Sequence, residues 1–155
     1  MPSLLLVLAA IMTGLYAGFL LTFLIAVMPG LAMLPDERFT AAMRRFNEKV
    51  PGPVFLVLFV GVVALPAAVA VTAFGGAGTG GAERACAAAA LVCALGSHFV
   101  TIAGNIPLNK ALAASEGGDD TAARQVFEPR WNSLHRVRTV LSLAAFALLA
   151  AVAVA

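Results

Sequence analysis

The run LLLVLAAIMTGLYAGFLLTFLIAVM, residues Leu4–Met28, holds 25 consecutive residues without a charged side chain. A helix needs about 20 apolar residues to cross the hydrocarbon core of a bilayer, where the backbone polar groups have to bond to one another. Pro29-Gly30 follows the run, and such a pair predicts the end of a helix. We therefore expect a transmembrane helix over Leu4–Met28.

Three further apolar windows follow, at about 53–74, 85–104 and 131–155. Pro129 suits the first turn of a helix, so we expect the last helix to begin near Pro129 and to enter the lipid near Arg138. Only 12% of the residues are charged, about half the share in soluble domains. The sequence predicts an all-α fold, a four-transmembrane-helix bundle that forms a single integral membrane domain over residues 1–155.

The basic residues separate by loop. Arg84 alone lies on one side of the expected membrane, whereas nine basic residues lie on the other: Arg38, Arg44, Arg45, Lys49, Lys110, Arg124, Arg130, Arg136 and Arg138. Cytoplasmic loops carry the excess of lysine and arginine in membrane proteins. We expect a multi-pass protein of the cell membrane, with both termini extracytoplasmic and loops one and three cytoplasmic.

Both cytoplasmic loops carry helix signals. In loop one, Asp36 suits the N-cap of a helix, and apolar residues recur at helical spacing behind it: Phe39, Ala42, Met43, Phe46 and Val50. We expect a short amphipathic interfacial helix that lies on the inner leaflet or caps the bundle. In loop three, the run 117–120 (Gly-Gly-Asp-Asp) predicts a turn and a cap before a short helix to about Phe127.

The sequence argues against several function classes. A net charge of +2 without a basic run gives no support for nucleic-acid binding. Cys86 and Cys93 lie two helical turns apart, roughly 10 Å along the axis, which is too far for a disulfide. Because no CxxC motif occurs, a thiol-redox membrane enzyme is disfavoured, and the lack of an acidic residue in helix one disfavours a small proton-coupled exporter.

The third window contains His98, and an ionisable residue inside a span is a candidate functional residue by default. Thr101 and Asn105 follow at i+3 and i+7, which would place the three side chains on one helix face. The alternative is a neutral histidine that serves helix packing. Beyond it, Pro107 should break the helix at 104–109 and expose carbonyls and two amides, those of Asn105 and Asn109; a plain capped helix end is the alternative.

The fourth window carries a polar stripe at i, i+4, i+7 and i+11: Trp131, His135, Arg138 and Ser142. Trp131 could instead be an interfacial belt residue. Arg138 needs an anionic partner, yet no Asp or Glu lies within a span, so a bound anion or a developing oxyanion is one candidate; freed carbonyls and lipid phosphate are the others. We predict that His98 and Arg138 converge on one cavity near the cytoplasmic surface.

Two signals remain open. Gly14 and Gly18 form a GxxxG pair that favours close helix packing, and Tyr16 beside them could line a pocket. A metal site is not expected, because a site made from His98 and His135 alone would have too few ligands; it is kept as an alternative.

The assembled pattern resembles a family of small four-helix membrane proteins that includes anthrone oxygenases. The resemblance rests on Met28-Pro29-Gly30-Leu31, on Asn47, and on two longer motifs: His98-x-x-Thr101-x-x-x-Asn105-x-Pro107-Leu108-Asn109 and Trp131-x-x-x-His135-x-x-Arg138-Thr139. It covers most of the chain, and the Asn-x-Pro-Leu-Asn segment joined to the tryptophan–arginine stripe is its most specific part.

The resemblance implies an oxygenase that deprotonates a lipophilic, anthrone-like substrate and lets the product react with O₂ without a cofactor. In that reading His98 is the general base, and Arg138, Asn105 and Asn109 stabilise the oxyanion. The substrate would be bound by another set: Trp131, His135, Thr101, Asn47 and Tyr16. The expected partners are the bilayer, the aromatic substrate and O₂, with a homo-oligomer left open.

Two other functions fit the same residues. A non-catalytic binder or transporter of a small lipophilic or anionic solute would use the polar cluster as its binding site. A structural subunit of a larger membrane complex would use the cluster to contact a partner protein. Oxygen consumption with an anthrone, against binding alone, separates the first alternative from the oxygenase.

Overall fold

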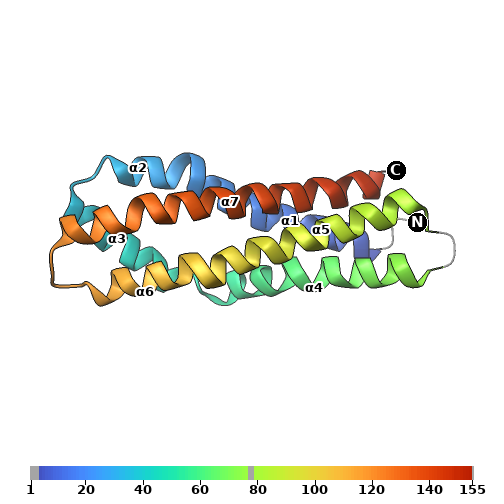
Figure 1. The fold of residues 1–155 in the computed structure, drawn as a ribbon, viewed down its shortest axis with the longest axis horizontal. Helices are drawn as coiled ribbons and strands as arrows, with labels where there is room; N and C mark the ends of the chain where they lie inside the picture. Colours follow the sequence, from blue (N-terminus) through green and yellow to red (C-terminus); the bar gives the residue numbers. More distant parts are fainter. Residues whose placement is uncertain (1–3, 77–78, 155) are drawn as a thin grey trace.

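A computed structural model of the chain describes residues 4–76 and 79–154. These residues form helices only, in this order: α1 (Leu4–Thr22), η1 (Phe23–Val27), α2 (Met28–Ala32), α3 (Asp36–Lys49), α4 (Pro53–Gly75), α5 (Gly81–Val100), η2 (Thr101–Asn105), α6 (Ile106–Ala114) and α7 (Asp120–Val154). The segments η1 and η2 are π-helices. Figure 1 shows an elongated bundle in which the start of α1 and the end of α7 lie at the same end.

Four helical rods are long and apolar enough to cross a membrane: Leu4–Ala32, Pro53–Gly75, Gly81–Ala114 and Asp120–Val154. The outer faces of the rods are apolar and exposed; Val54, Val57 and Val60 on α4 are each more than 60% exposed. In water such a surface would be unfavourable, whereas against lipid tails it is not. The predicted all-α four-helix bundle is confirmed, and the chain is a multi-pass membrane protein.

α4 packs against α1 and α5 in the part of the bundle nearer the termini. At the other end of the bundle, α3 takes its place and packs against α6 and α7 (Figure 1). We call this end the polar cap; it consists of α2, α3, α6 and the part of α7 up to Trp131. Its apolar core contains large side chains: Met28, Phe39, Met43, Leu112, Phe127 and Trp131.

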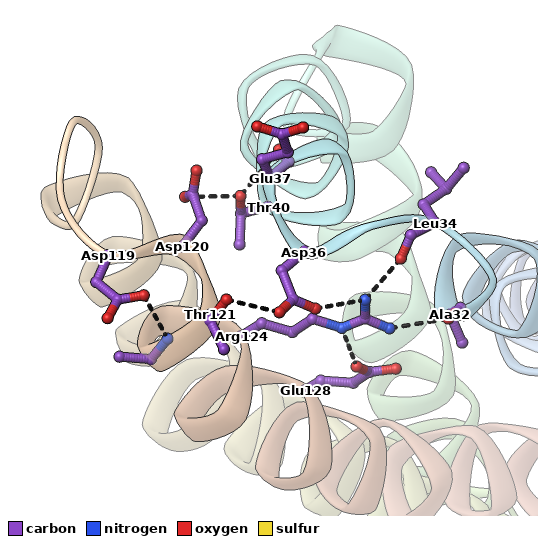
Figure 2. A network of polar contacts seen from close by, with 11 residues as sticks. Ala32, Leu34, Asp36, Glu37, Thr40, Asp119, Asp120, Thr121, Arg124 and Glu128 are labelled. Atoms are coloured by element: carbon purple, nitrogen blue, oxygen red, sulfur yellow. Dashed lines mark hydrogen bonds and ion pairs between the residues drawn. The ribbon is translucent and has the colours of Figure 1, made fainter.

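A partly buried arginine holds three parts of the polar cap together (Figure 2). The Arg124 guanidinium on α7 donates to the main-chain oxygens of Ala32 at 2.9 Å and Leu34 at 2.8 Å. It also pairs with Asp36 at 3.0 Å and Glu128 at 2.7 Å. These groups come from the end of α2, the start of α3 and α7. One side chain therefore fixes how the segment from α2 to α3 packs on α7.

A second arginine joins α3 to the connection between α6 and α7. Arg44 is 7% exposed; it pairs with Asp120 at 3.0 Å and donates to Leu112 O at 3.0 Å and Ser115 Oγ at 3.1 Å. Asp120 also accepts from the Thr40 hydroxyl at 2.8 Å. Two of the basic residues counted for membrane orientation therefore have structural partners inside the polar cap.

The helix boundaries correct two predictions. The last helix, α7, begins at Asp120, so Pro129 lies inside it and does not start it. Asp36 is the first residue of α3 and makes no cap bond; its carboxylate binds Arg124. The turn at loop three is as predicted, because Gly117 has a φ of +84° and the Asp119 carboxylate accepts the N–H of Ala122 at 3.0 Å.

The sequence predicted that the first and third rods break at their prolines. Neither rod breaks there. Each passes through a five-residue π-helix and continues as an α-helix, in which Pro29 or Pro107 occupies the first turn. Proline lacks an N–H and clashes with the carbonyl four residues before it. The i→i+5 pattern of a π-helix absorbs this defect, and such segments are common at functional sites. The expected turn at 104–109 is therefore a helical segment.

Candidate functional site

A cavity of about 170 Å³ lies where both π-helices meet α7. Its wall combines aromatic rings with a few polar groups: Phe19, Leu20, Phe23, Phe46, Asn47, Val50, Pro51, Phe55, Leu56, Phe59, Thr101, Asn105, Ile106, Asn109, Trp131 and Arg138. Phe46, Pro51 and Leu56 are exposed as well as cavity-lining. The cavity therefore has an apolar rim at the connection between α3 and α4.

Arg138 is the charged group of this cavity and is 8% exposed. Its Nε donates to His135 Nδ1 at 3.0 Å and its Nη1 to Thr101 Oγ1 at 3.4 Å, while its guanidinium carbon lies 5.4 Å from the centre of the Trp131 ring. None of the ion pairs found among residues 4–76 and 79–154 includes Arg138. A buried cation that meets only neutral groups is costly and would be stabilised by a negatively charged partner.

His135 orients this arginine. The imidazole is fully buried and stacks on Trp131 with ring centres 4.5 Å apart. Because Nδ1 accepts from Arg138, the ring hydrogen is assigned to Nε2, which donates to Leu20 O at 2.9 Å. With both nitrogens engaged, His135 has no lone pair left for a metal, and no group of three or more His, Cys, Asp or Glu side chains in the described part of the chain could hold one.

Two asparagines present opposite groups to the cavity. The Asn109 Oδ1 accepts from Trp131 Nε1 at 2.9 Å, which leaves its Nδ2 as a donor. The Asn105 Nδ2 donates to Trp131 O at 3.3 Å, and its Oδ1 has no partner among the described residues. The Nδ2 of Asn47, a residue of α3, also lacks a partner among them. The wall therefore offers both donors and an acceptor.

His98 and Tyr16 do not line the cavity. His98 stacks on Phe59 with ring centres 3.9 Å apart, and the fully buried Tyr16 ring lies 6.4 Å from it. The spacing argument placed His98 on the face of Thr101 and Asn105; these two residues line the cavity, whereas His98 lies in α5 just before η2 and packs against the lining residue Phe59. The convergence of His98 and Arg138 on one cavity stays a prediction.

Six of the nine predicted site residues line the cavity: Asn47, Thr101, Asn105, Asn109, Trp131 and Arg138. His135 does not line the cavity, but it contacts lining residues, among them Trp131, Arg138 and Leu20. Sequence reasoning missed the aromatic wall, although Phe19 with Phe23 and Phe55 with Phe59 are i, i+4 pairs that share a helix face. That spacing was the available signal.

The family model of the anthrone oxygenases matches residues 55–148. This segment is more than half of the chain. The protein belongs to the anthrone oxygenase family. No curated protein and no solved structure gives a significant match.

In this anthrone oxygenase family member, the matched segment runs from the start of α4 into the second half of α7. It includes the η2 residues Thr101 and Asn105 and the α7 residues Trp131 and Arg138. The lining residues that come from α1, η1 and α3 and from the connection between α3 and α4 lie before residue 55. The matched segment therefore supplies most of the polar wall, and the preceding segment supplies aromatic rings and Asn47.

Proposed function

We propose that this protein is a membrane-embedded, cofactor-independent oxygenase for a planar, apolar, anthrone-like substrate with an acidic CH₂ group conjugated to a carbonyl. The observation that carries the proposal is Arg138, a buried guanidinium at a cavity of aromatic rings, with only neutral partners. Ionisation of the substrate would create the missing negative charge beside it. Family membership supports the same reaction class.

The proposed reaction balances without a further redox partner. Loss of a proton from the CH₂ gives an enolate, which transfers one electron to O₂ and then forms a C–O bond with the resulting superoxide. Protonation gives a hydroperoxide. Loss of the second proton from the same carbon breaks the O–O bond and expels hydroxide, so the products are the quinone and one water.

The side chains fit this reaction in two ways. Arg138 and the Nδ2 of Asn109 are donors for the enolate oxygen, and preorganised donors of this kind stabilise developing charge. Trp131 and the phenylalanine rings provide flat apolar contacts for a planar substrate. Asn105, expected at the oxyanion, uses its Nδ2 for Trp131 O and is left with an unpaired Oδ1; because this atom only accepts hydrogen bonds, we reassign Asn105 away from that role.

His98 stays a prediction as the general base. Phe59 lines the cavity and stacks on His98, so direct proton transfer requires the Phe59 ring to turn aside. Replacement His98→Gln should then abolish O₂ uptake while expression is unchanged. Unchanged turnover would remove His98 from the mechanism and leave hydroxide as the base.

The decisive experiment measures O₂ uptake and quinone formation by the purified protein in nanodiscs supplied with anthrone. We expect one O₂ consumed for each quinone formed, and a fall in kcat of about 10²–10³-fold for Arg138→Met, the usual effect of losing an oxyanion donor. Arg136→Met is the matched control, because Arg136 is an exposed arginine on the same helix. Binding of anthrone without O₂ uptake would replace this proposal by the binder or transporter.

A further inference from the structure

Two buried amide atoms of the cavity residues have no hydrogen-bond partner within the described chain: Asn105 Oδ1 and Asn47 Nδ2. Asn105 is 1% exposed. Leaving a buried polar atom without a partner costs about 1–3 kcal/mol, and such atoms in native proteins call for an explanation. At a cavity wall, the explanation we test is a ligand that supplies the partner.

Trp131 fixes which amide atom of Asn105 is left without a partner. The main-chain oxygen of Trp131 can only accept, so the Asn105 amide nitrogen has to point to it and Oδ1 is left over. The indole N–H of Trp131 can only donate, so Asn109 has to turn Oδ1 toward it and is left with Nδ2. One tryptophan thus sets two asparagines of the same helical rod in opposite senses.

The unpaired groups therefore divide by hydrogen-bonding type. Arg138 and the Nδ2 atoms of Asn47 and Asn109 are donors, and a carbonyl or enolate oxygen satisfies them. That oxygen cannot satisfy Asn105 Oδ1, because both are acceptors. A ligand that fills the cavity with a ketone alone would leave Asn105 unpaired and would bind at a penalty.

We infer that Asn105 is a specificity-determining residue, which accepts a hydrogen bond from a hydroxyl group of the aromatic ligand while the carbonyl oxygen of the same ligand faces Arg138. The inference rests on the proposed function only for the nature of the ketone end. Asn105 takes no part in the chemistry; it favours aromatic ketones that carry a hydroxyl donor over those that lack one. Asn109 and Trp131 hold the ring system and the orientation of the amides.

Binding can be measured without catalysis. Trp131 is the only tryptophan of the chain and lines the cavity, so its fluorescence reports occupancy. Suitable probes are anthraquinone, its 1- and 2-hydroxy derivatives and the matching methoxy derivatives, which have no CH₂ and do not react. We expect one hydroxy isomer, in its neutral form, to bind the intact protein in nanodiscs roughly tenfold tighter than its methoxy and unsubstituted partners, as one hydrogen bond predicts.

Asn105→Leu should abolish this preference, so that all three probes bind alike. Asn109→Leu is the matched control: it removes a donor, weakens all three probes and leaves the preference for the hydroxyl intact. Equal binding of hydroxy and methoxy probes to the unchanged protein overturns the inference even if a variant fails to fold. A hydroxyl preference that survives Asn105→Leu overturns it as well.

The two proposals fail separately. If anthrone is oxidised but no probe shows a hydroxyl preference, the role of Asn105 is wrong and the oxygenase stands. If the probes show the preference and Asn105→Leu removes it, while no anthrone is oxidised, Asn105 determines the specificity of a binding site and the oxygenase falls.

Discussion

The bundle packs by different rules at its two ends. At the end of the bundle where the two termini lie, the core contains many small residues, among them Ala9, Ala10, Ala87 and Ala90. In the polar cap, the core is aromatic and methionine-rich, and two arginines tie separate segments together. Small residues let helices approach closely in lipid, where no hydrophobic force joins them. In the polar cap, burial of large apolar side chains and ion pairs with buried or partly buried arginines hold the helices together.

The candidate site lies between these two regions. The alanine-rich interface is closely packed, with Ala9, Ala87 and Ala90 buried, and the polar cap is held by the contacts of Arg44 and Arg124. Where they meet, the first and third rods both contain π-helices, and the cavity forms beside them. A cavity can persist there because both neighbouring regions hold their shape without filling it.

The largest effect should come from the junction itself. Replacing His135 with Leu removes the acceptor for Arg138 Nε and the donor for Leu20 O. We expect kcat for anthrone oxidation to fall by about 10²-fold, the size of effect that follows when an oxyanion donor is lost. Steady-state O₂ uptake would measure it.

His135→Asn is the matched control, because an amide also offers one donor and one acceptor and should restore most of the activity. If Leu and Asn variants have equal kcat, His135 does not position Arg138.

The next effect should be confined to the polar cap. Arg124→Met removes contacts to two carbonyls and two carboxylates, and we expect a loss of about 2–3 kcal/mol in the free energy of unfolding. Hydrogen exchange should rise in α2 and α3 and stay unchanged at the alanine-rich end. Arg130→Met, which changes an exposed arginine of the same helix, is the control; equal loss in both variants would contradict the role given to Arg124.

The smallest effect tests the alanine-rich end. A Cβ added at Gly14 would lie 2.9 Å from Phe146 on α7, whereas a Cβ at Gly18 would meet nothing within 4 Å. We expect Gly14→Ala to lower stability by about 1 kcal/mol, and Gly18→Ala to leave it unchanged or raise it slightly. Thermal unfolding in detergent would compare them. An equal loss in both would mean that the whole GxxxG pair, and not Gly14 alone, is a packing site.

The sequence by itself determined the four apolar rods, because each is a long uncharged run and lipid accepts no other backbone than a hydrogen-bonded one. It also determined the polar stripe on α7, whose residues Trp131, His135, Arg138 and Ser142 are all buried. Because α7 is α-helical throughout, the 3.6-residue spacing holds there. Six cavity residues were found in this way or through the family motif.

Only the tertiary structure showed the π-helix of the third rod, because a π-helix is not visible in residue spacing, and only it placed the Phe59 ring against His98. It also decided that Arg44 and Arg124 serve the polar cap, since their partners lie about 70 to 90 residues away along the chain. The orientation of Asn105 was decided in the same way by the Trp131 carbonyl on another helix. When the hydrogen-bond partner of a side chain is distant in the sequence, only the folded chain brings the two together, so the local sequence cannot predict it.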